Sequence, residues 1–231
     1  LLEDNTLEEL IEVYMGDLVG DQVYEKFGVE FPLLIKYIDA CDNLSIQVHP
    51  DDATAKERHN AYGKTEMWYL VDADPGAELI LGFQKDTDKK EYLEHLRQNT
   101  LPDLLNVEKV KKGNCFFIPA GTVHAICKGC FIAEIQQTSD ITYRIYDYDR
   151  RDKNGNPREL HTELATDVIH FSAQKEHAIH YHLHENHTEE LVSCNYFTTN
   201  ILKFDKEIEK DYMEIDSFVI YMCLEGNFSV V

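Results

Sequence analysis

The histidine at position 124 follows a turn motif that presents a side chain at the start of a strand. The segment reads Gly113, five residues, Pro119, one residue, Gly121, two residues and then His124. A β-strand delivers the chain to the Pro/Gly turn, and the next strand begins with a histidine that points into the mouth of a barrel. An imidazole in that place could bind a metal ion. The alternative is an ordinary half-buried histidine after a turn.

Three further polar side chains occur on predicted strands upstream. Gln47 and His49 are two residues apart and therefore project from the same face of one strand, and Glu66 begins the next apolar strand. The segment that ends at His124 resembles the second cupin motif. The Gln47-x-His49 pair followed by Glu66 resembles the first cupin motif, with glutamine in place of the first histidine and a longer intervening loop.

Together these residues offer two imidazoles, one carboxylate and one amide carbonyl to a metal, from Gln47, His49, Glu66 and His124. Three or four N and O ligands, with positions left for water or substrate, are typical of a catalytic rather than a closed structural site. Such a mixture suits zinc, manganese or iron, so spacing alone does not name the metal.

Four segments resemble type I phosphomannose isomerases, in particular the shorter bacterial form. They are QVHPDD, GKTEMWY, IPAGTVHAI and AEIQQTSDITYR, and the similarity runs from about residue 1 to 227. The resemblance implies a cupin fold and an enzyme that interconverts mannose 6-phosphate and fructose 6-phosphate. It also implies one zinc ion per chain, or another divalent metal, bound by the residues that match the family ligands: Gln47, His49, Glu66 and His124.

The resemblance further implies roles for residues beside the metal. Lys64 stands two residues before the glutamate ligand, Arg144 ends the run SD-x-x-x-R, and Glu134 and Asp140 fall on positions that line the site. Aldose–ketose isomerisation moves a proton between neighbouring carbons through an enediol(ate), so it needs an acid/base group and stabilisation of oxyanion charge. The metal and Arg144 would stabilise the charge. Lys64 is the favoured acid/base group, and Glu134 is the alternative.

The phosphate of the substrate needs cations close to the metal, because the chain as a whole is acidic. We expect Ser45, Arg144 and Lys64 to bind the substrate. For the phosphate, Arg144 is an available cation, and Ser45 beside the ligand strand can donate a hydrogen bond. Further cations lie in the next loop, namely Arg150, Arg151 and Lys153. The alternative for that loop is a solvated surface segment.

Short β-like runs separated by Gly, Pro, Asp and Asn are the elements that would position these residues, and they predict an antiparallel barrel or sandwich. The predicted strands are 31–39, 44–49, 66–72, 78–83, 114–118, 123–127, 130–137 and 142–147. A helix with a Thr6/Glu9 capping box is predicted up to Tyr14. Additional helical segments are predicted at 87–99, near 101–105 and, weakly, at 161–169.

The expected fold class is all-β, a cupin (jelly-roll) barrel with helical additions and the start of a second cupin-like barrel. Residues 1–175 form the expected metal-binding core, and 176–231 a linker and the start of a metal-free second domain, with strands at 195–204 and 217–224. The resemblance implies that part of the family precedes this core and that the second domain continues further. A histidine-rich tract at 177–187 lies at this boundary, where we favour a surface linker over a second metal site.

Charge and composition narrow the class of partner. The chain has 22 Lys+Arg against 43 Asp+Glu, and its net charge of −21 would repel nucleic acid and an anionic membrane. No apolar run reaches the roughly 20 residues that span a bilayer. We therefore expect a cytoplasmic protein, monomeric or homodimeric, that acts on a small-molecule sugar phosphate. The irregular spacing of the six cysteines favours free thiols.

Two other functions use the same fold. A metal-dependent cupin oxygenase would typically hold iron with a histidine-rich triad, and Gln47 and the KTE run disfavour it. A non-catalytic sugar-binding cupin would be expected to have lost Lys64 or Arg144, and both are present. Fold alone does not separate these classes, because cupins host many functions.

Overall fold

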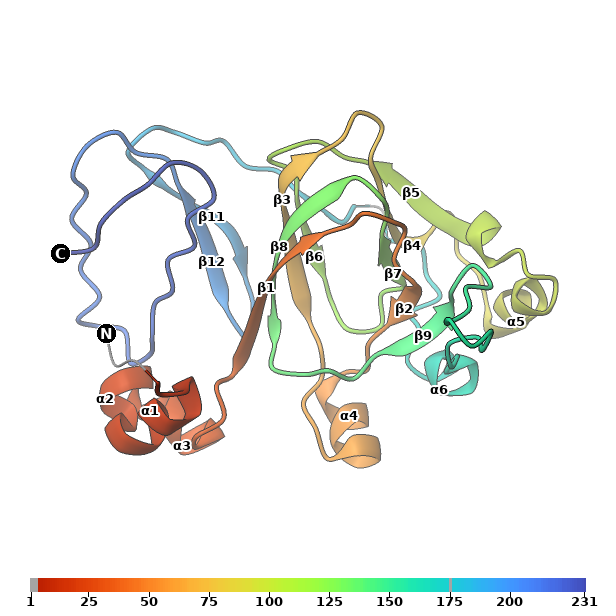
Figure 1. Cartoon of the computed structure of the whole chain (residues 1–231), viewed down its shortest axis with the longest axis horizontal. Helices are drawn as coiled ribbons and strands as arrows, with labels where there is room; N and C mark the ends of the chain where they lie inside the picture. The colour runs from red at the N-terminus through yellow and green to blue at the C-terminus, as the bar shows by residue number, and fades with distance from the viewer. Residues whose placement is uncertain (1–3, 175) are drawn as a thin grey trace.

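Two antiparallel sheets of five strands each dominate the computed structural model, which describes residues 4–174 and 176–231. Sheet I has the order β1-β8-β3-β6-β10, with bounds Leu33–Asp39, Cys130–Gln137, Glu66–Ala73, Cys115–Ile118 and Ala178–Ile179. Sheet II has the order β5-β4-β7-β2-β9, with bounds Leu105–Lys109, Glu78–Phe83, His124–Ile126, Ile46–Val48 and Tyr143–Tyr146. Figure 1 shows the two sheets facing each other, which confirms the predicted antiparallel, mainly β architecture.

The space between the sheets is filled by side chains from alternate strand positions. Trp68 and Leu70 of β3 pack there against Leu79 and Leu81 of β4, and all four are fully buried. Met67, which lies between the inward positions of β3, points to the opposite face of sheet I. Burial of each such side chain contributes about 1.5–3 kcal/mol. Because both faces of β3 are covered, its sequence is apolar at consecutive positions.

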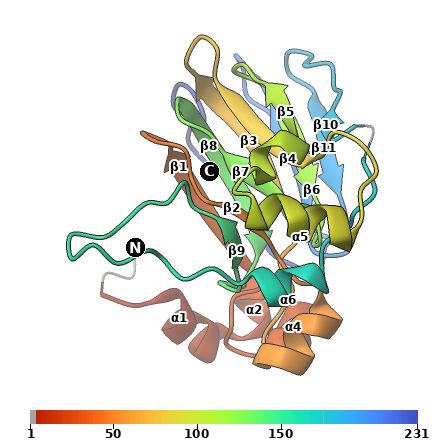
Figure 2. The ribbon, with the colours of Figure 1, turned by 90° about the vertical axis from the view of Figure 1, so that its right-hand side faces the viewer.

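Helices cover the outer face of sheet II, as Figure 2 shows for α5 (Lys89–Arg97) and α6 (Thr162–Thr166). Ile46 and Val48 of β2 belong to this outer cluster with Tyr92 of α5. Their neighbours on the strand therefore face the interior, which is how β2 directs Gln47 inward. The 3₁₀ helix η1 (Leu101–Leu104) adds Leu101 and Leu104 to the same cluster.

A separate two-stranded sheet covers the outer face of sheet I. It consists of β11 (Thr188–Ser193) and β12 (Thr198–Leu202), which pair antiparallel. Leu191, Val192 and Phe197 pack from it against Met67 and Cys115 of sheet I. The molecule is thus layered, with helices, sheet II, sheet I and the β11–β12 sheet in that order (Figure 1).

The predicted N-terminal helix is present as α1 (Leu7–Tyr14). Both halves of its capping box are formed, because Glu9 N donates to Thr6 Oγ1 at 3.2 Å and Thr6 N donates to Glu9 Oε2 at 2.7 Å. Two short helices, α2 (Gly16–Val19) and α3 (Asp21–Phe27), follow it. A further helix, α4 (Asp52–His59), occupies the long loop that precedes β3.

Several predicted elements differ in the structure. The predicted strand at 217–224 is wrong, because no helix or strand is formed between 204 and 231. Val219, Ile220 and Tyr221 are more than two-fifths exposed, and without a paired neighbour an apolar run has no ladder to join. The helix predicted near 101–105 is η1, and β5 then begins at Leu105.

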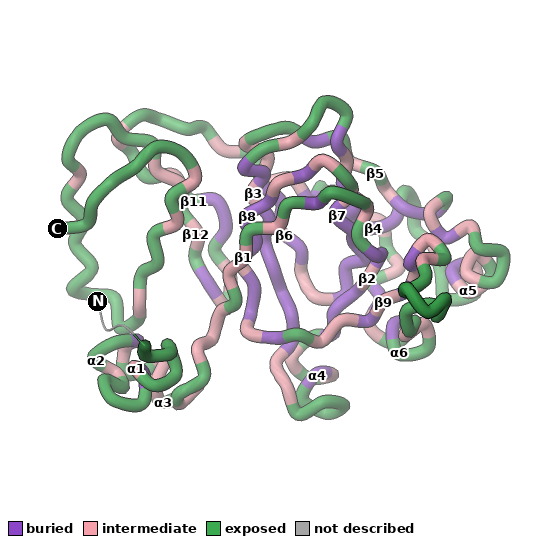
Figure 3. Tube along the Cα trace, in the orientation of Figure 1, coloured by how far each residue is buried: buried purple, intermediate pink, exposed green. Residues whose placement is uncertain are grey.

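The C-terminal segment instead packs beside the first helices and strand. The Asp216 carboxylate accepts hydrogen bonds from the backbone N–H groups of Asp21 and Gln22, and Tyr37 OH donates to Cys223 O. Figure 3 shows most of this segment as exposed. The predicted domain boundary falls on residue 175, outside the described residues, and β10, which follows it, is hydrogen-bonded to β6 of sheet I.

Two expectations from composition, on the cysteines and on membrane-spanning segments, can be compared directly with the structure. All six cysteines are free thiols, as predicted. Within residues 4–174 and 176–231, no helix has the length and apolar character needed to cross a bilayer.

Candidate metal centre

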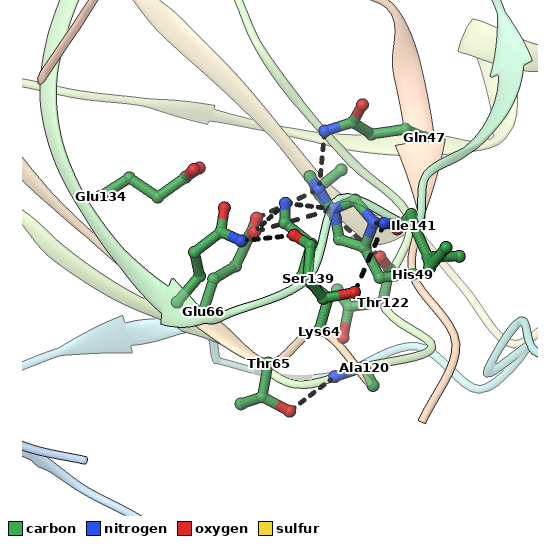
Figure 4. A network of polar contacts seen from close by, with 12 residues as sticks. Gln47, His49, Lys64, Thr65, Glu66, Ala120, Thr122, Glu134, Ser139 and Ile141 are labelled. Atoms are coloured by element: carbon green, nitrogen blue, oxygen red, sulfur yellow. Dashed lines mark hydrogen bonds and ion pairs between the residues drawn. The ribbon is translucent and has the colours of Figure 1, made fainter. Parts of the chain in front are cut away.

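Three strands bring the four predicted ligands together between the sheets. Gln47 lies at the centre of β2, and its register partner on the neighbouring strand β7 is His124. His49 follows the end of β2, and Glu66 is the first residue of β3 in the opposite sheet. Figure 4 shows the side chains of Gln47, His49 and Glu66 directed toward one another. His124 is the first residue of β7 (His124–Ile126), so a strand begins after the turn at this residue.

The potential ligand atoms lie within bonding reach of one ion. One atom each from His49, Glu66 and His124 lies within 4.8 Å of the others. Nε2 of His124 is 3.2 Å from Oε1 of Glu66, and Nε2 of His49 is 3.7 Å from Oε2 of Glu66. The Gln47 amide nitrogen is 3.3 Å from His124 Nε2, and rotation of the amide by half a turn would present its oxygen instead.

Hydrogen bonds on the far side of each ring fix which imidazole nitrogen is free. Nδ1 of His49 is 2.9 Å from Ile141 O, and Nδ1 of His124 is 2.8 Å from Thr122 O. A carbonyl oxygen only accepts, so in both rings Nδ1 carries the hydrogen and Nε2 presents a lone pair toward Glu66. This arrangement is the one that metal-binding histidines adopt.

The carboxylate of Glu66 is paired at one of its oxygens, since Lys64 Nζ lies 2.6 Å from Oε2. The side chain is fully buried, and its Oε1 atom has no hydrogen-bond partner among the described residues. Oε1 and the lone pair of His124 Nε2 face each other as two acceptors. A cation between them would satisfy both, so the donor set of imidazole, carboxylate and amide fits a divalent metal.

Burial also sets the protonation of these groups. Burial, followed by the charge of Lys64, lowers the pKa of His124 to about 4 and the pKa of His49 well below its usual value. Both rings are therefore neutral near pH 7 and able to act as ligands. Burial raises the pKa of Glu66 to about 7, and the ammonium of Lys64 opposes this effect.

Lys64 lies directly beside the converging ligand atoms. Its Nζ atom is 2.6 Å from Oε2 of Glu66 and 2.8 Å from Nε2 of His49, and the residue is 5% exposed. Figure 4 shows the Lys64 side chain beside those of Glu66 and His49. The structure thus brings Lys64 into contact with two of the predicted ligands. Lys64 itself lies in the loop before β3, two positions ahead of Glu66.

Glu134 is held by two residues that the sequence analysis did not single out. Lys36 of β1 and Trp68 of β3 are its register partners on either side, and they contact its carboxylate at 2.7 Å and 2.8 Å. Burial alone would raise the pKa of Glu134, but Lys64 and Lys36 outweigh it and lower the pKa. A single lysine in the apolar run of 33–38 was the available sequence signal for Lys36.

Arg144 and Ser45 meet at the edge of sheet II. Arg144 of β9 is the register partner of Gln47, and its Nε atom donates to Ser45 Oγ at 3.3 Å. Its Nη1 atom donates to Glu159 O at 2.9 Å. Burial, and then the nearby charges of Arg158 and Arg150, lower the pKa of Arg144. Three arginines therefore gather near the ligand strand.

Asp147 anchors two of these arginines. It is buried, and it forms ion pairs with Arg150 and, at 3.7 Å, with Arg158. Arg150 was among the predicted cations, whereas Arg158 was not. Arg151 donates to Gly155 O and pairs with Asp149 within its own loop.

Two other predicted residues, Lys153 and Asp140, are exposed and do not join the buried group. In the histidine-rich tract, His180 pairs with Glu176 and His184 with Glu189. Among the described residues, one cluster of at least three His, Cys, Asp or Glu side chains could hold a metal. It consists of His49, Glu66 and His124. The tract thus supplies no second such cluster in the described part of the chain.

Comparisons with known proteins point to one family. Residues 2–108 match the family model described as phosphomannose isomerase type I, catalytic domain. The chain is 39% identical over 227 residues to mannose-6-phosphate isomerase ManA of Bacillus subtilis, with 96% of this chain and 69% of that protein aligned. It is 49% identical over 139 residues to a mannose-6-phosphate isomerase of Streptococcus mutans, with 60% of this chain and 44% of that protein aligned.

A solved structure agrees with these matches. The crystal structure of the mannose 6-phosphate isomerase from Bacillus subtilis superposes with a TM-score of 0.65 at 36% identity, covering 78% of this chain and 60% of that one. This likeness confirms the predicted cupin fold. The chain spans about half of the length of two of the curated relatives that it matches.

Proposed function

The chain belongs to the type I phosphomannose isomerase family, and on this premise we propose that it interconverts mannose 6-phosphate and fructose 6-phosphate at a bound zinc ion. The observation that carries the proposal is the group of three buried ligand atoms within 4.8 Å of one another. Lys64 and the arginines near Gln47 supply the other groups that isomerisation of a sugar phosphate requires.

We propose that the metal is held by Gln47, His49, Glu66 and His124. When bound, a divalent cation polarises a sugar oxygen and so stabilises negative charge that develops during isomerisation. Neutral imidazoles with one carboxylate and open positions favour zinc, and the same donors also accept manganese or iron. The zinc assignment is therefore tested separately from the metal site itself.

For the proton transfer we propose Lys64, with Glu134 as the alternative. The reaction removes a proton from C2 of the aldose and returns one to C1, through an enediol(ate). The Lys64 nitrogen is the closer to the ligands, since it contacts Glu66 and His49. Glu134 is held by Lys36 and Trp68, and its lowered pKa makes its carboxylate a weaker base. These contacts favour Lys64.

For the phosphate we propose Arg144 and Ser45, supported by Arg150. The Arg144 guanidinium already donates to Ser45 Oγ, and a phosphate oxygen can accept from both. Arg150 is kept nearby by its ion pair with Asp147. The exposed loop position of Arg151 makes it a poorer candidate.

We propose that the protein works in the cytoplasm on a small-molecule sugar phosphate, as a monomer or homodimer. Its net charge of −21 disfavours binding to nucleic acid or to an anionic membrane. The local arginines offset this charge where the phosphate would bind.

A coupled assay for fructose 6-phosphate formed from mannose 6-phosphate tests the function. It is run on the metal-loaded protein, after chelation and after return of zinc. We expect turnover that chelation abolishes and zinc restores. A folded, metal-loaded protein that binds the sugar phosphate without turnover would instead be a non-catalytic sugar-binding cupin, and the isomerase proposal would be abandoned.

A further inference from the structure

The carboxylate of Asp52 joins three segments that are distant in sequence. Asp52 is the first residue of α4, three positions after His49. Its Oδ1 atom accepts hydrogen bonds from Gly63 N at 2.8 Å and from Gln137 Nε2 at 2.9 Å. Its Oδ2 atom accepts one from Tyr196 OH at 2.7 Å. We call these four residues, Asp52, Gly63, Gln137 and Tyr196, the Asp52 network.

The network surrounds the backbone that carries Lys64. Gly63 precedes this lysine, and Gln137 Oε1 accepts from Thr65 N at 2.8 Å on its other side. The N–H of Lys64 itself donates to Pro50 O at 3.1 Å. Three successive N–H groups, at residues 63, 64 and 65, are thus bonded to the segment after His49 or to β8. The lysine is therefore positioned relative to His49 by backbone contacts.

Close packing reinforces this arrangement. A Cβ atom added to Gly63 would lie 2.5 Å from Asp52 N and 2.6 Å from Asp51 C. The loop before β3 is therefore in direct backbone contact with the start of α4, and there is no space for a side chain between them. A displacement of α4 would consequently be transmitted to the neighbouring residue, Lys64.

Tyr196 extends the network to the β11–β12 sheet. It lies in the turn between these two strands, which pack on sheet I through Leu191, Val192 and Phe197. Its hydroxyl is the contact that this turn makes with Asp52. In this way the sheet on the outside of sheet I is connected to the loop of Lys64.

We propose that the Asp52 network positions Lys64 for proton transfer, with Asp52 and Tyr196 as positioning residues that do not touch the substrate. This inference rests on the proposed isomerase function. A small displacement of a reacting group is enough to lower a rate substantially. Loss of the network should therefore lower kcat more than it changes KM, and it should leave the metal in place.

Four single variants test the inference. Asp52→Ala removes all three accepted hydrogen bonds, and Tyr196→Phe removes one. Asp52→Asn keeps an oxygen toward Gly63 and Gln137, and its Nδ2 group can donate a hydrogen bond to the Tyr196 hydroxyl oxygen, which reverses the direction of that bond. Tyr181→Phe is the matched control, because Tyr181 OH donates to Gly113 O at the same 2.7 Å distance but lies outside the network.

We expect kcat to fall about 10–100-fold for Asp52→Ala and several-fold for Tyr196→Phe, by analogy with other supporting hydrogen bonds. Asp52→Asn should recover most of the rate, and Tyr181→Phe should match the parent. Metal content should stay at the parent value in all four. Urea unfolding should show similar losses of stability for the two tyrosine variants, so a rate loss confined to Tyr196→Phe separates positioning from stability.

A second measurement does not depend on activity. The Lys64 side chain is buried, so its acylation by an amine-reactive reagent should be slow in the parent. The rate of acylation is measured by mass spectrometry. It should become several-fold faster in Asp52→Ala and Tyr196→Phe, and remain slow in Asp52→Asn and Tyr181→Phe. Parent protein without turnover would overturn the proposed function, and the labelling would still decide the positioning role. Equal labelling in Tyr196→Phe, Asp52→Ala and the control would overturn the inference, as would metal loss parallel to the loss of rate.

Discussion

Lys36 and Glu134 stand directly opposite each other on β1 and β8, and their side chains form an ion pair of 2.7 Å. Glu134 is 3% exposed, so its charge depends on the cations and donors that surround it. The pair lies on sheet I near the candidate metal centre, because the charge of Lys64 also acts on Glu134.

Replacement of Lys36 by methionine should destabilise the protein by about 1–2 kcal/mol, because it removes a charged partner from a buried carboxylate. Adding Glu134→Gln to this variant should return part of that loss, since the unpaired charge is then removed as well. Urea unfolding of the two single variants and the double variant measures the coupling. Lys153→Met, at an exposed loop position, serves as the control. Additive effects of the two changes would argue against the ion pair.

His124→Ala should abolish both metal content and isomerase activity, because it removes a buried nitrogen ligand from the group with His49 and Glu66. Metal per chain is measured by mass spectrometry of the purified protein. His182→Ala, which changes an exposed histidine, should leave metal and activity unchanged. Retention of a full metal complement by the His124 variant would show that the metal lies elsewhere.

Arg144→Ala should keep the metal and lose about 100-fold in kcat/KM, because the phosphate and the developing charge lose a guanidinium partner. Arg144→Lys should recover only part of this loss, since an ammonium cannot form the paired contact. Arg151→Ala should change kcat/KM less than about twofold, as Arg151 contacts its own loop. A comparable loss in the Arg151 variant would place the phosphate at that loop instead.

Asp52 should contribute to stability in a pH-dependent way. Burial would raise its pKa, but hydrogen bonds from Tyr196, Gln137 and Gly63 outweigh burial and lower the pKa below the ordinary value of 3.8. The contribution is therefore fully present above the unfolded pKa and is lost as the pH falls through the folded pKa. The difference in unfolding free energy between the parent and Asp52→Asn should be constant from pH 7 to about pH 5 and then shrink toward pH 3. A difference that grows on acidification would contradict the assigned contacts.

The local sequence predicted the strands β2, β3 and β7, which carry the candidate ligands, because strand and turn geometry act over a few residues. The two-residue spacing of Gln47 and His49 directs both inward, and the Pro/Gly turn places His124 at the start of β7. The Thr6 capping box likewise marked the beginning of α1. Each of these features depends on residues that are neighbours in the sequence, so the short segment that contains the feature is enough to predict it.

Other features of the fold and of the candidate site were decided by contacts between segments that are distant in the sequence. Lys36 meets Glu134 across 98 positions and Tyr196 meets Asp52 across 144, and neither pair can be identified without the strand pairing and layer packing. The apolar run at 217–224 has strand composition but no paired neighbour, so composition alone predicted it wrongly. The sequence by itself determined which residues could bind a metal, through local backbone periodicity. Only the tertiary structure decided which cations and hydrogen bonds surround them, because register and packing join residues that are far apart along the chain.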